Sequence, residues 1–217
     1  GQTTMTALIT LSHGSRHPRA KEGIRALTEA AAAELGVEWA DAHLEFDTPG
    51  LAEAAAALDS PRAVVVPLLF TRAFHAKVDV PRHLDEARAH SDLVLAEPLG
   101  TGADIADVLH QRLRIDASSA PHATLFPVGT SDAEQAANYR RLSDDLARRA
   151  GIDVAVVPAT GGDRRFVEKQ THVLPLFVTH GTLLNRIPAH LTASGPLTTD
   201  LAGVVAERYR AAVEKDA

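Results

Sequence analysis

The sequence contains no cysteine among its 217 residues. Disulfide bridges, thiolate metal sites and thiol nucleophiles are therefore excluded, although the redox compartment stays open. Long apolar runs are also missing, since no stretch approaches the roughly 18 residues that a membrane span needs. The residues after Met5 have no basic segment followed by an apolar one, as a signal peptide would. We therefore expect a cytoplasmic protein with no membrane partner.

Positive charge is in deficit as well, because the formal net charge is -6. A nucleic-acid-binding domain usually carries a basic excess, so no nucleic-acid partner is expected. The hydrophobic content of 45% and the charged content of 23% are ordinary for a globular protein. A chain of this length can form one large or two small α/β domains.

Short β-prone runs alternate with helical segments along the chain. Residues 7–11, 39–46 and 63–70 are typical of strands, and the last of these is continuously apolar, as expected for a parallel strand that is covered on both faces. Between the first two runs, Ile24 and Leu27 begin an apolar stripe with helical spacing. This alternation predicts an α/β fold in which helices flank a parallel sheet.

The pattern then starts again in the second half. Residues 123–151 repeat the order of strand, turn and amphipathic helix, and "HVLPLFVTHGTLLNRIP" (172–188) resembles "VVVPLLFTRAFHAKVDVP" (64–81). A repeat of roughly 110 residues is too long for a solenoid and predicts two similar α/β lobes related by internal duplication. We expect an N-terminal lobe over residues 1–116, which carries the active site, and a degenerate C-terminal copy over residues 117–217.

The duplication allows the two halves to be compared position by position. The first half has three potential metal ligands or proton acceptors, which are His13, Glu45 and His75. Their counterparts in the second half are Val128, Thr160 and Leu183. The scaffold is therefore repeated, whereas the chemistry is confined to the first lobe.

His13, Glu45 and His75 each follow or end a different predicted strand. Ligands of open parallel sheets bind beyond the carboxyl ends of the strands, so the three side chains are expected at one edge. Two imidazoles and one carboxylate suit a borderline divalent ion such as Fe²⁺, Co²⁺, Ni²⁺ or Zn²⁺. A neutral imidazole also accepts protons near neutral pH. The alternative is a turn histidine, an exposed strand residue and a loop histidine without a common role.

Basic residues are grouped around these positions, which indicates a polyanionic small ligand. They are Arg16, Arg19, Lys21, Arg72, Lys77, Arg82, Arg164, Arg165 and Arg186. For each of them the alternative is a solvated surface charge.

The segments "LITLSHGSR", the second-strand "HLEF" with the following "TPGL", and "VVVPLLFTRAFHAKVDVP" resemble the sirohydrochlorin chelatases of the CbiX and SirB type. The resemblance implies that His13, Glu45 and His75 bind the incoming ion and take protons from pyrrole nitrogens. It implies insertion of Fe²⁺, Co²⁺ or Ni²⁺ into sirohydrochlorin, for siroheme or cobalamin biosynthesis. The ion is a substrate, and no organic cofactor is implied.

The same resemblance leads us to expect substrate contacts from Ser15, Arg16, Arg72, Phe74 and Lys77, since sirohydrochlorin carries carboxylates. The family has glycine before the loop histidine, where this chain has Arg72-Ala73-Phe74. The chain has no histidine-rich tail of the kind found in long cobalt-specific forms. We expect a monomer or a homodimer.

Two other functions remain open from the sequence. A phosphohydrolase with His13 as nucleophile would carry arginine directly before its histidine, where this chain has Ser12. A non-catalytic metal or tetrapyrrole carrier would use the same ligands as a chelatase. His180, in "VTHG", ends a predicted strand of the second half, where a structural role is favoured over that of an auxiliary ligand.

Overall fold

The structure, a computed structural model, describes residues 5–72, 74–161, 165–166 and 170–216, and at residues 74–78 it describes the backbone alone. The chain forms two compact units. The first contains residues 1–100 and 198–217, and the second contains residues 101–197. Among the described residues, no helix is both long enough and apolar enough to cross a membrane.

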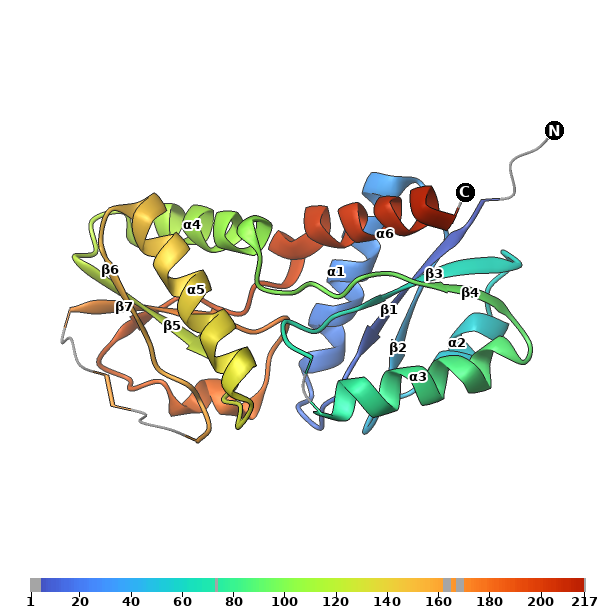
Figure 1. Cartoon of the computed structure of the whole chain (residues 1–217), viewed down its shortest axis with the longest axis horizontal. Coiled ribbons are helices and arrows are strands. Elements are labelled where there is room, and N and C mark those ends of the chain that lie inside the picture. Colours follow the sequence, from blue (N-terminus) through green and yellow to red (C-terminus); the bar gives the residue numbers. More distant parts are fainter. Residues whose placement is uncertain (1–4, 73, 162–164, 167–169, 217) are drawn as a thin grey trace. The chain divides into compact units, whose positions relative to one another are not determined.

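The first unit is a parallel sheet with helices on both faces (Figure 1). Its strands lie in the order β2-β1-β3-β4. Its elements are β1 (Ala7–Ser12), α1 (Ala20–Leu35), β2 (Trp39–His43), α2 (Leu51–Ala56), β3 (Arg62–Pro67), α3 (Phe74–Arg88), β4 (Asp92–Leu95), the 3-10 helix η2 (Thr198–Leu201) and α6 (Ala202–Asp216). The strand at 63–70 thus ends at Pro67, because the chain leaves the sheet there.

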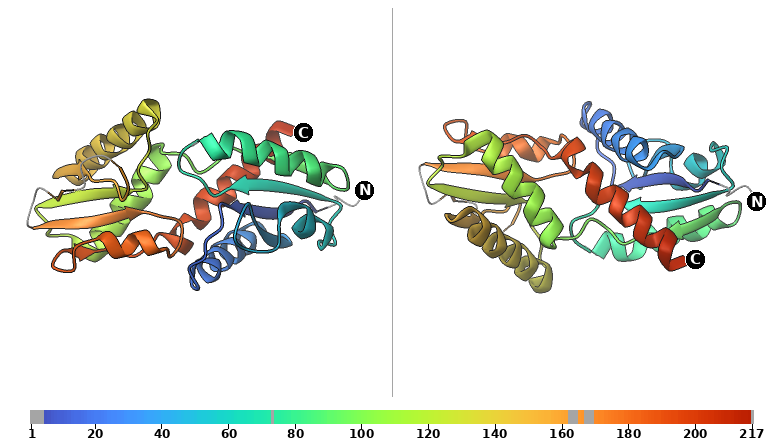
Figure 2. Two further views of the ribbon diagram at one scale, coloured as in Figure 1. Left: turned by 90° about the horizontal axis from the view of Figure 1, so that it is seen from below. Right: turned by 90° about the horizontal axis from the view of Figure 1, so that it is seen from above.

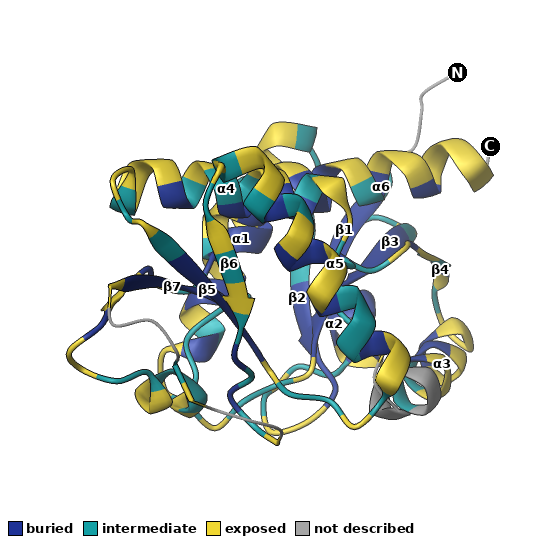
Figure 3. Cartoon of the chain, turned by 60° about the vertical axis from the view of Figure 1, so that its left-hand side comes forward, coloured by how far each residue is buried: buried dark blue, intermediate teal, exposed yellow. Residues whose placement is uncertain are grey.

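Alternate residues of the central strands pack on opposite faces of this sheet. Ile9 and Leu11 of β1 join Val65 of β3 in an apolar cluster with α2 and with Val80 and Leu84 of α3. Helices α1 and α6 pack together, and α6 also contacts β3 and β4. Figure 3 shows β1 and β3 as buried, as expected for central strands covered on both sides.

The second unit repeats this arrangement, which confirms the predicted duplication. Its parallel sheet has the order β6-β5-β7-β8, the same order as in the first unit. Figure 2 shows strands of this sheet in yellow-green and orange, together with the green and gold helices of the unit. Its elements are α4 (Ala103–Ala117), β5 (His122–Pro127), α5 (Ala133–Ala150), β6 (Asp153–Val156), β7 (Thr171–Leu176), the 3-10 helix η1 (Thr182–Arg186) and β8 (Thr192–Ala193). The α/β fold class predicted from the sequence is confirmed.

Backbone hydrogen bonds fix the correspondence between the two copies. Beyond β2, the amide of Leu44 donates to the carbonyl of Ser12 at 2.9 Å. Beyond β6, the amide of Ala159 donates to the carbonyl of Pro127 at 2.8 Å. Ser12 and Pro127 each end the first strand of their sheet, so Leu44 corresponds to Ala159. The next residues, Glu45 and Thr160, therefore correspond as well, as the sequence comparison predicts.

The compact units do not coincide with the predicted lobes, 1–116 and 117–217. The division falls after Gly100 and again before Thr198. The physical reason is packing: α4 lies against α5 and β7, whereas α6 lies against α1, β3 and β4. The last helix of each sequence repeat therefore folds with the strands of the other repeat.

Arginine side chains hold both of these helices in place. Arg208 of α6 donates from Nε to the carbonyl of Pro98 at 2.9 Å, within the first unit. Arg112 of α4 donates from Nη1 to the carbonyl of Gly195 at 2.8 Å, within the second unit. Each helix thus clamps the irregular segment that follows the last strand of its unit, which satisfies carbonyls that have no strand partner.

Candidate active site

The site predicted from the sequence lies at the carboxyl edge of the first sheet. β1 is hydrogen-bonded to β2 on one side and to β3 on the other, so the strand order reverses at β1. Ligand sites of open α/β sheets form at this kind of switch point, outside the carboxyl ends of the strands. His13 directly follows β1, and Glu45 lies two residues after β2.

His13 and Glu45 are brought together by a continuation of the β1–β2 ladder. The amide of Glu45 donates to the carbonyl of His13 at 2.9 Å. Their side chains meet as well, with Nε2 of His13 3.8 Å from Oε2 of Glu45. Both side chains are about half exposed. The two side chains can therefore bind one ion that arrives from solvent, because their donor atoms are exposed and close together.

Gly14 allows this close approach of the two chain segments. A Cβ atom at this position would lie 1.6 Å from the carbonyl oxygen of Glu45, and the residue has φ 97°. Any other residue would clash with the backbone and occupy a conformation that side chains disfavour. The glycine of "SHGS" is thus required by the pairing of His13 with Glu45.

Phe46 follows Glu45 in a conformation that is rare for a bulky residue. Its φ is 66°, and the amide of Asp47 donates to the carbonyl of Glu45 at 2.8 Å. This three-residue turn with positive φ is the strained kind of γ-turn. Asp47 supports the turn, because its Oδ2 accepts the amide hydrogen of Ser15 at 3.1 Å.

The ring of Phe46 stands beside the His13–Glu45 pair. Phe46 is 56% exposed. The guanidinium carbon of Arg16 lies 4.7 Å from its ring centroid, a cation–π contact, and the His13 ring meets it edge-on at 6.4 Å. Phe46 is not among the predicted site residues, because residues 39–46 have the pattern of one strand, whereas β2 ends at His43. The signal was present: the second copy has glycine, Gly161, at this step.

A buried hydrogen-bond chain lies under the site and was also missed. Ser12 and His43 are directly paired across β1 and β2, and Ser12 Oγ lies 2.6 Å from Nδ1 of His43. Nε2 of His43 lies 2.8 Å from Oδ2 of Asp41, whose Oδ1 accepts a hydrogen bond from Nη1 of Arg25 at 3.0 Å. The signal was the alternation of Asp41, His43 and Glu45, which places polar groups on one strand face.

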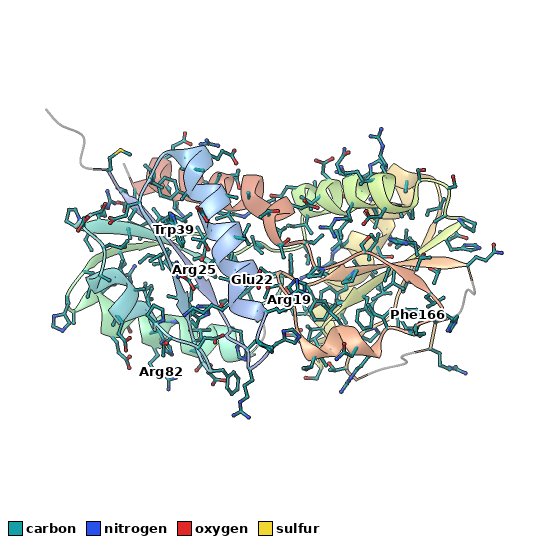
Figure 4. All side chains as sticks on the ribbon, turned by 180° about the vertical axis from the view of Figure 1, so that it is seen from behind. Arg19, Glu22, Arg25, Trp39, Arg82 and Phe166 are labelled. Atoms are coloured by element: carbon teal, nitrogen blue, oxygen red, sulfur yellow. The ribbon has the colours of Figure 1, made fainter. Side chains whose placement is uncertain are left out.

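The neighbours of Asp41 in this hydrogen-bond chain favour its charged form. Burial raises the pKa of its carboxyl group, but the hydrogen bond and charge of His43 together with the charge of Arg25 outweigh burial and hold the pKa below its ordinary value. Figure 4 labels Arg25 and Trp39, whose side chains lie next to each other, with the guanidinium 5.1 Å from the Trp39 ring centroid. The hydrogen-bond chain from Ser12 to Arg25 therefore fixes the end of β2, two residues before Glu45.

The third predicted ligand, His75, lies in the first turn of α3, where the sequence analysis expected a loop. The side chains of His75, Phe74 and Lys77 lie outside the described part of the structure, so their predicted roles stay predictions. Among the described residues, no group of three or more His, Asp or Glu side chains is placed to hold a metal ion. The described site thus consists of the His13–Glu45 pair.

The other predicted substrate residues have definite contacts. Arg72 donates from Nη2 to Oε2 of Glu97 at 2.7 Å, so its charge is matched by a carboxylate. It lines a cleft of about 410 Å³ together with Leu69, Val80 and other residues of the first unit. Ser15 Oγ accepts the amide hydrogen of His17 at 3.0 Å. Arg16 lies over the ring of Phe46, which in turn meets the His13 ring.

His180 belongs to the second unit, past the end of β7. Its favoured structural role stays a prediction. The second copy keeps the glycine of the turn, since a Cβ atom at Gly129 would lie 1.7 Å from the carbonyl oxygen of Thr160. The close approach of the two chain segments is therefore kept where His13 and Glu45 have been replaced, although Gly14 has a positive φ and Gly129 does not.

Comparison with known proteins gives a consistent result. The model of the CbiX family matches residues 7–116, about half of the chain. A sirohydrochlorin cobaltochelatase of Sulfurisphaera tokodaii is 38% identical over 73 residues, which are 32% of this chain and 60% of that protein. A sirohydrochlorin ferrochelatase of Priestia megaterium is 25% identical over 226 residues, covering 94% of this chain and 84% of that protein.

A solved structure matches both units. SirB from Bacillus subtilis with Fe3+ superposes with a TM-score of 0.80 at 19% identity, covering 98% of this chain and 97% of that chain. At this identity the match shows a shared fold, with two units of the same architecture.

Proposed function

The chain belongs to the CbiX family, and on this premise we propose that it inserts Fe²⁺ or Co²⁺ into sirohydrochlorin. The observation that carries the proposal is the half-exposed pair of His13 and Glu45, 3.8 Å apart at the switch point of the sheet. The curated relatives named above act on the same tetrapyrrole with iron or cobalt. The product would serve siroheme or cobalamin biosynthesis.

The chemistry requires metal ligands and proton acceptors in one place. Two pyrrole N–H protons must leave as a divalent ion enters the ring, and proton acceptors must be within roughly 3 Å of them or reach them through a water molecule. His13 and Glu45 deliver the ion and accept these protons. Imidazole and carboxylate ligands without thiolate hold a borderline ion weakly enough to release it. His75 completes this set as the third ligand.

Substrate binding rests on the basic residues of the same unit. Arg16, at the mouth of the pair, meets a substrate carboxylate, and Lys77, Phe74 and Ser15 add contacts. Arg72 binds a substrate carboxylate once its ion pair with Glu97 has been broken. A phosphohydrolase is disfavoured, because the residue before His13 is Ser12, whose hydroxyl group is bonded to buried His43.

Turnover tests the proposal directly. Sirohydrochlorin is incubated without oxygen with Fe²⁺ or Co²⁺, and its spectral conversion is followed. We expect wild type to exceed the uncatalysed background, and the variant His13→Ala/His75→Ala to lose at least about 100-fold of the catalysed rate. The variant His90→Ala, at an exposed position after α3, serves as control and keeps the wild-type rate.

Equal rates for wild type and the double variant would refute the catalytic assignment. A carrier would bind sirohydrochlorin and metal without accelerating conversion. A phosphohydrolase would release phosphate from a test ester without added metal.

A further inference from the structure

Phe46 has nearly the same φ as the glycine at the corresponding position of the second copy. Gly161 follows Thr160 as Phe46 follows Glu45, and its φ is 64° against 66° for Phe46. Both copies therefore have a positive φ at this step. Glycine adopts such a φ without strain, whereas a residue with a Cβ atom does not. The first copy nevertheless places one of the chain's six phenylalanines there.

The Phe46 ring does not compensate for this strain by burial. More than half of the residue is exposed, although phenylalanine side chains stabilise folds chiefly by leaving water. Its described ring contacts are with Arg16 and His13, which are themselves at the surface. A side chain that is strained, exposed and adjacent to a candidate catalytic pair is the pattern expected for a ligand contact.

The chemistry of this contact defines the ligand. An exposed aromatic face binds flat, conjugated or apolar surfaces by offset stacking. The guanidinium of Arg16, held 4.7 Å from the centroid of the same ring, binds carboxylates. The two groups together suit a flat macrocycle whose rim carries carboxylates.

We propose that Phe46 seats the face of the tetrapyrrole beside His13 and Glu45, while Arg16 binds a carboxylate at its rim. This inference rests on the proposed function and assigns the substrate-positioning group of the site. Phe46 acts in binding, and His13 and Glu45 act on the metal and the protons. The second copy has glycine at this step because it has no ligand pair to serve.

The variant Phe46→Gly separates this role from stability, because it removes the ring and relieves the turn. The dissociation constant for metal-free sirohydrochlorin is measured by absorbance titration. We expect roughly tenfold weaker binding, the size of effect of a lost aromatic contact. We also expect an unfolding temperature equal to or above that of wild type. Binding of Co²⁺ alone should not change, since the three proposed ligand side chains remain.

The variant Phe46→Trp keeps an aromatic face and should restore binding to within about twofold, although its backbone strain is the same. Unchanged sirohydrochlorin affinity in Phe46→Gly would overturn the inference, as would rescue that fails in Phe46→Trp despite a folded protein.

The binding titration and the turnover assay fail separately. If wild type converts sirohydrochlorin and Phe46→Gly binds it normally, the proposed function stands and the role of Phe46 is refuted. If wild type binds sirohydrochlorin through Phe46 but does not accelerate metal insertion, the role of Phe46 stands and the chelatase assignment falls. Wild type that binds no sirohydrochlorin refutes both.

Discussion

After its third strand, the first unit forms the long helix α3, whereas the second unit forms only the short η1 after β7. The opposite face of each sheet is built alike, with α1 and α6 packed together in one unit and α5 and α4 in the other. The conserved face carries no candidate ligand, and the face that differs includes the segment of His75. The comparison shows that the two copies share the helix packing on one face of the sheet, whereas the segment that carries a candidate ligand occurs in the first copy only.

Both units also bury a histidine in a polar network, but in different places. In the first unit, His43 links Ser12 to Asp41 beneath the candidate pair. In the second unit, Nε2 of His172 on β7 lies 2.8 Å from Ser194 Oγ, which donates to Asp116 of α4 at 2.6 Å. The second network ties the exchanged helix α4 to its sheet, whereas the first fixes the strand end that carries Glu45.

The largest effect should come from removing the carboxylate of Glu45, whereas removing the hydroxyl group at the corresponding position of the second copy should have little effect. Glu45→Gln removes a charged ligand and a proton acceptor, so the rate of metal insertion should fall by at least about 100-fold. Thr160→Val, at the corresponding position of the second copy, should change the rate by less than about twofold. Rates of Co²⁺ insertion into sirohydrochlorin measure both. A comparable loss in the two variants would contradict a site confined to the first copy.

The turn glycines should be sensitive to substitution in both copies. Gly14→Ala and Gly129→Ala each place a Cβ atom less than 2 Å from a backbone carbonyl oxygen, so each should lose roughly 3 kcal/mol in the free energy of unfolding. Gly203→Ala in α6, where a Cβ atom meets nothing within 4 Å, serves as control and should gain about 0.5 kcal/mol. Urea unfolding measures all three. A tolerated Gly129→Ala would mean that the second copy has relaxed its turn.

The smallest effect concerns pH and the second copy. Burial lowers the pKa of His172 below its ordinary value, and the charge of Asp116 offsets this only in part. Below a pH of about 6.5 the unfolded chain therefore binds a proton that the folded chain does not. The free energy of unfolding should fall as the pH is lowered from about 6.5 through the folded-state pKa.

His172→Gln should remove this part of the pH dependence, whatever it does to stability at pH 7.5. Urea unfolding at several pH values between about 7.5 and 5.5 gives the slopes to compare. His90→Gln, at an exposed position, is the matched control and should keep the wild-type slope. Equal slopes for wild type and His172→Gln would contradict the assignment.

Much of the fold followed from local patterns. The apolar run over residues 63–70 and the stripe beginning at Ile24 and Leu27 predicted a parallel α/β sheet, because strand and helix periods differ. The repeat predicted that Glu45 of the first copy corresponds to Thr160 of the second, and the backbone hydrogen bonds confirm this correspondence. The meeting of His13 with Glu45 could be predicted as well, because parallel strands end at a common edge.

The parts that were missed depend on packing between distant segments. The exchange of α4 and α6 could not be read from the sequence, because the apolar residues that each helix buries do not specify which sheet it covers. The strain at Phe46 is invisible in a one-dimensional pattern, since an aromatic residue after Glu45 also suits a strand. The buried role of His43 required its register with Ser12.

The sequence by itself determined the fold class, the duplication and the residue types available for metal and proton chemistry, because these depend on composition, periodicity and spacing. Only the tertiary structure decided which unit each terminal helix joins, how closely His13 and Glu45 approach, and why Gly14 and Phe46 occupy their turns. These properties depend on distances between atoms that are far apart along the chain, and close packing sets those distances.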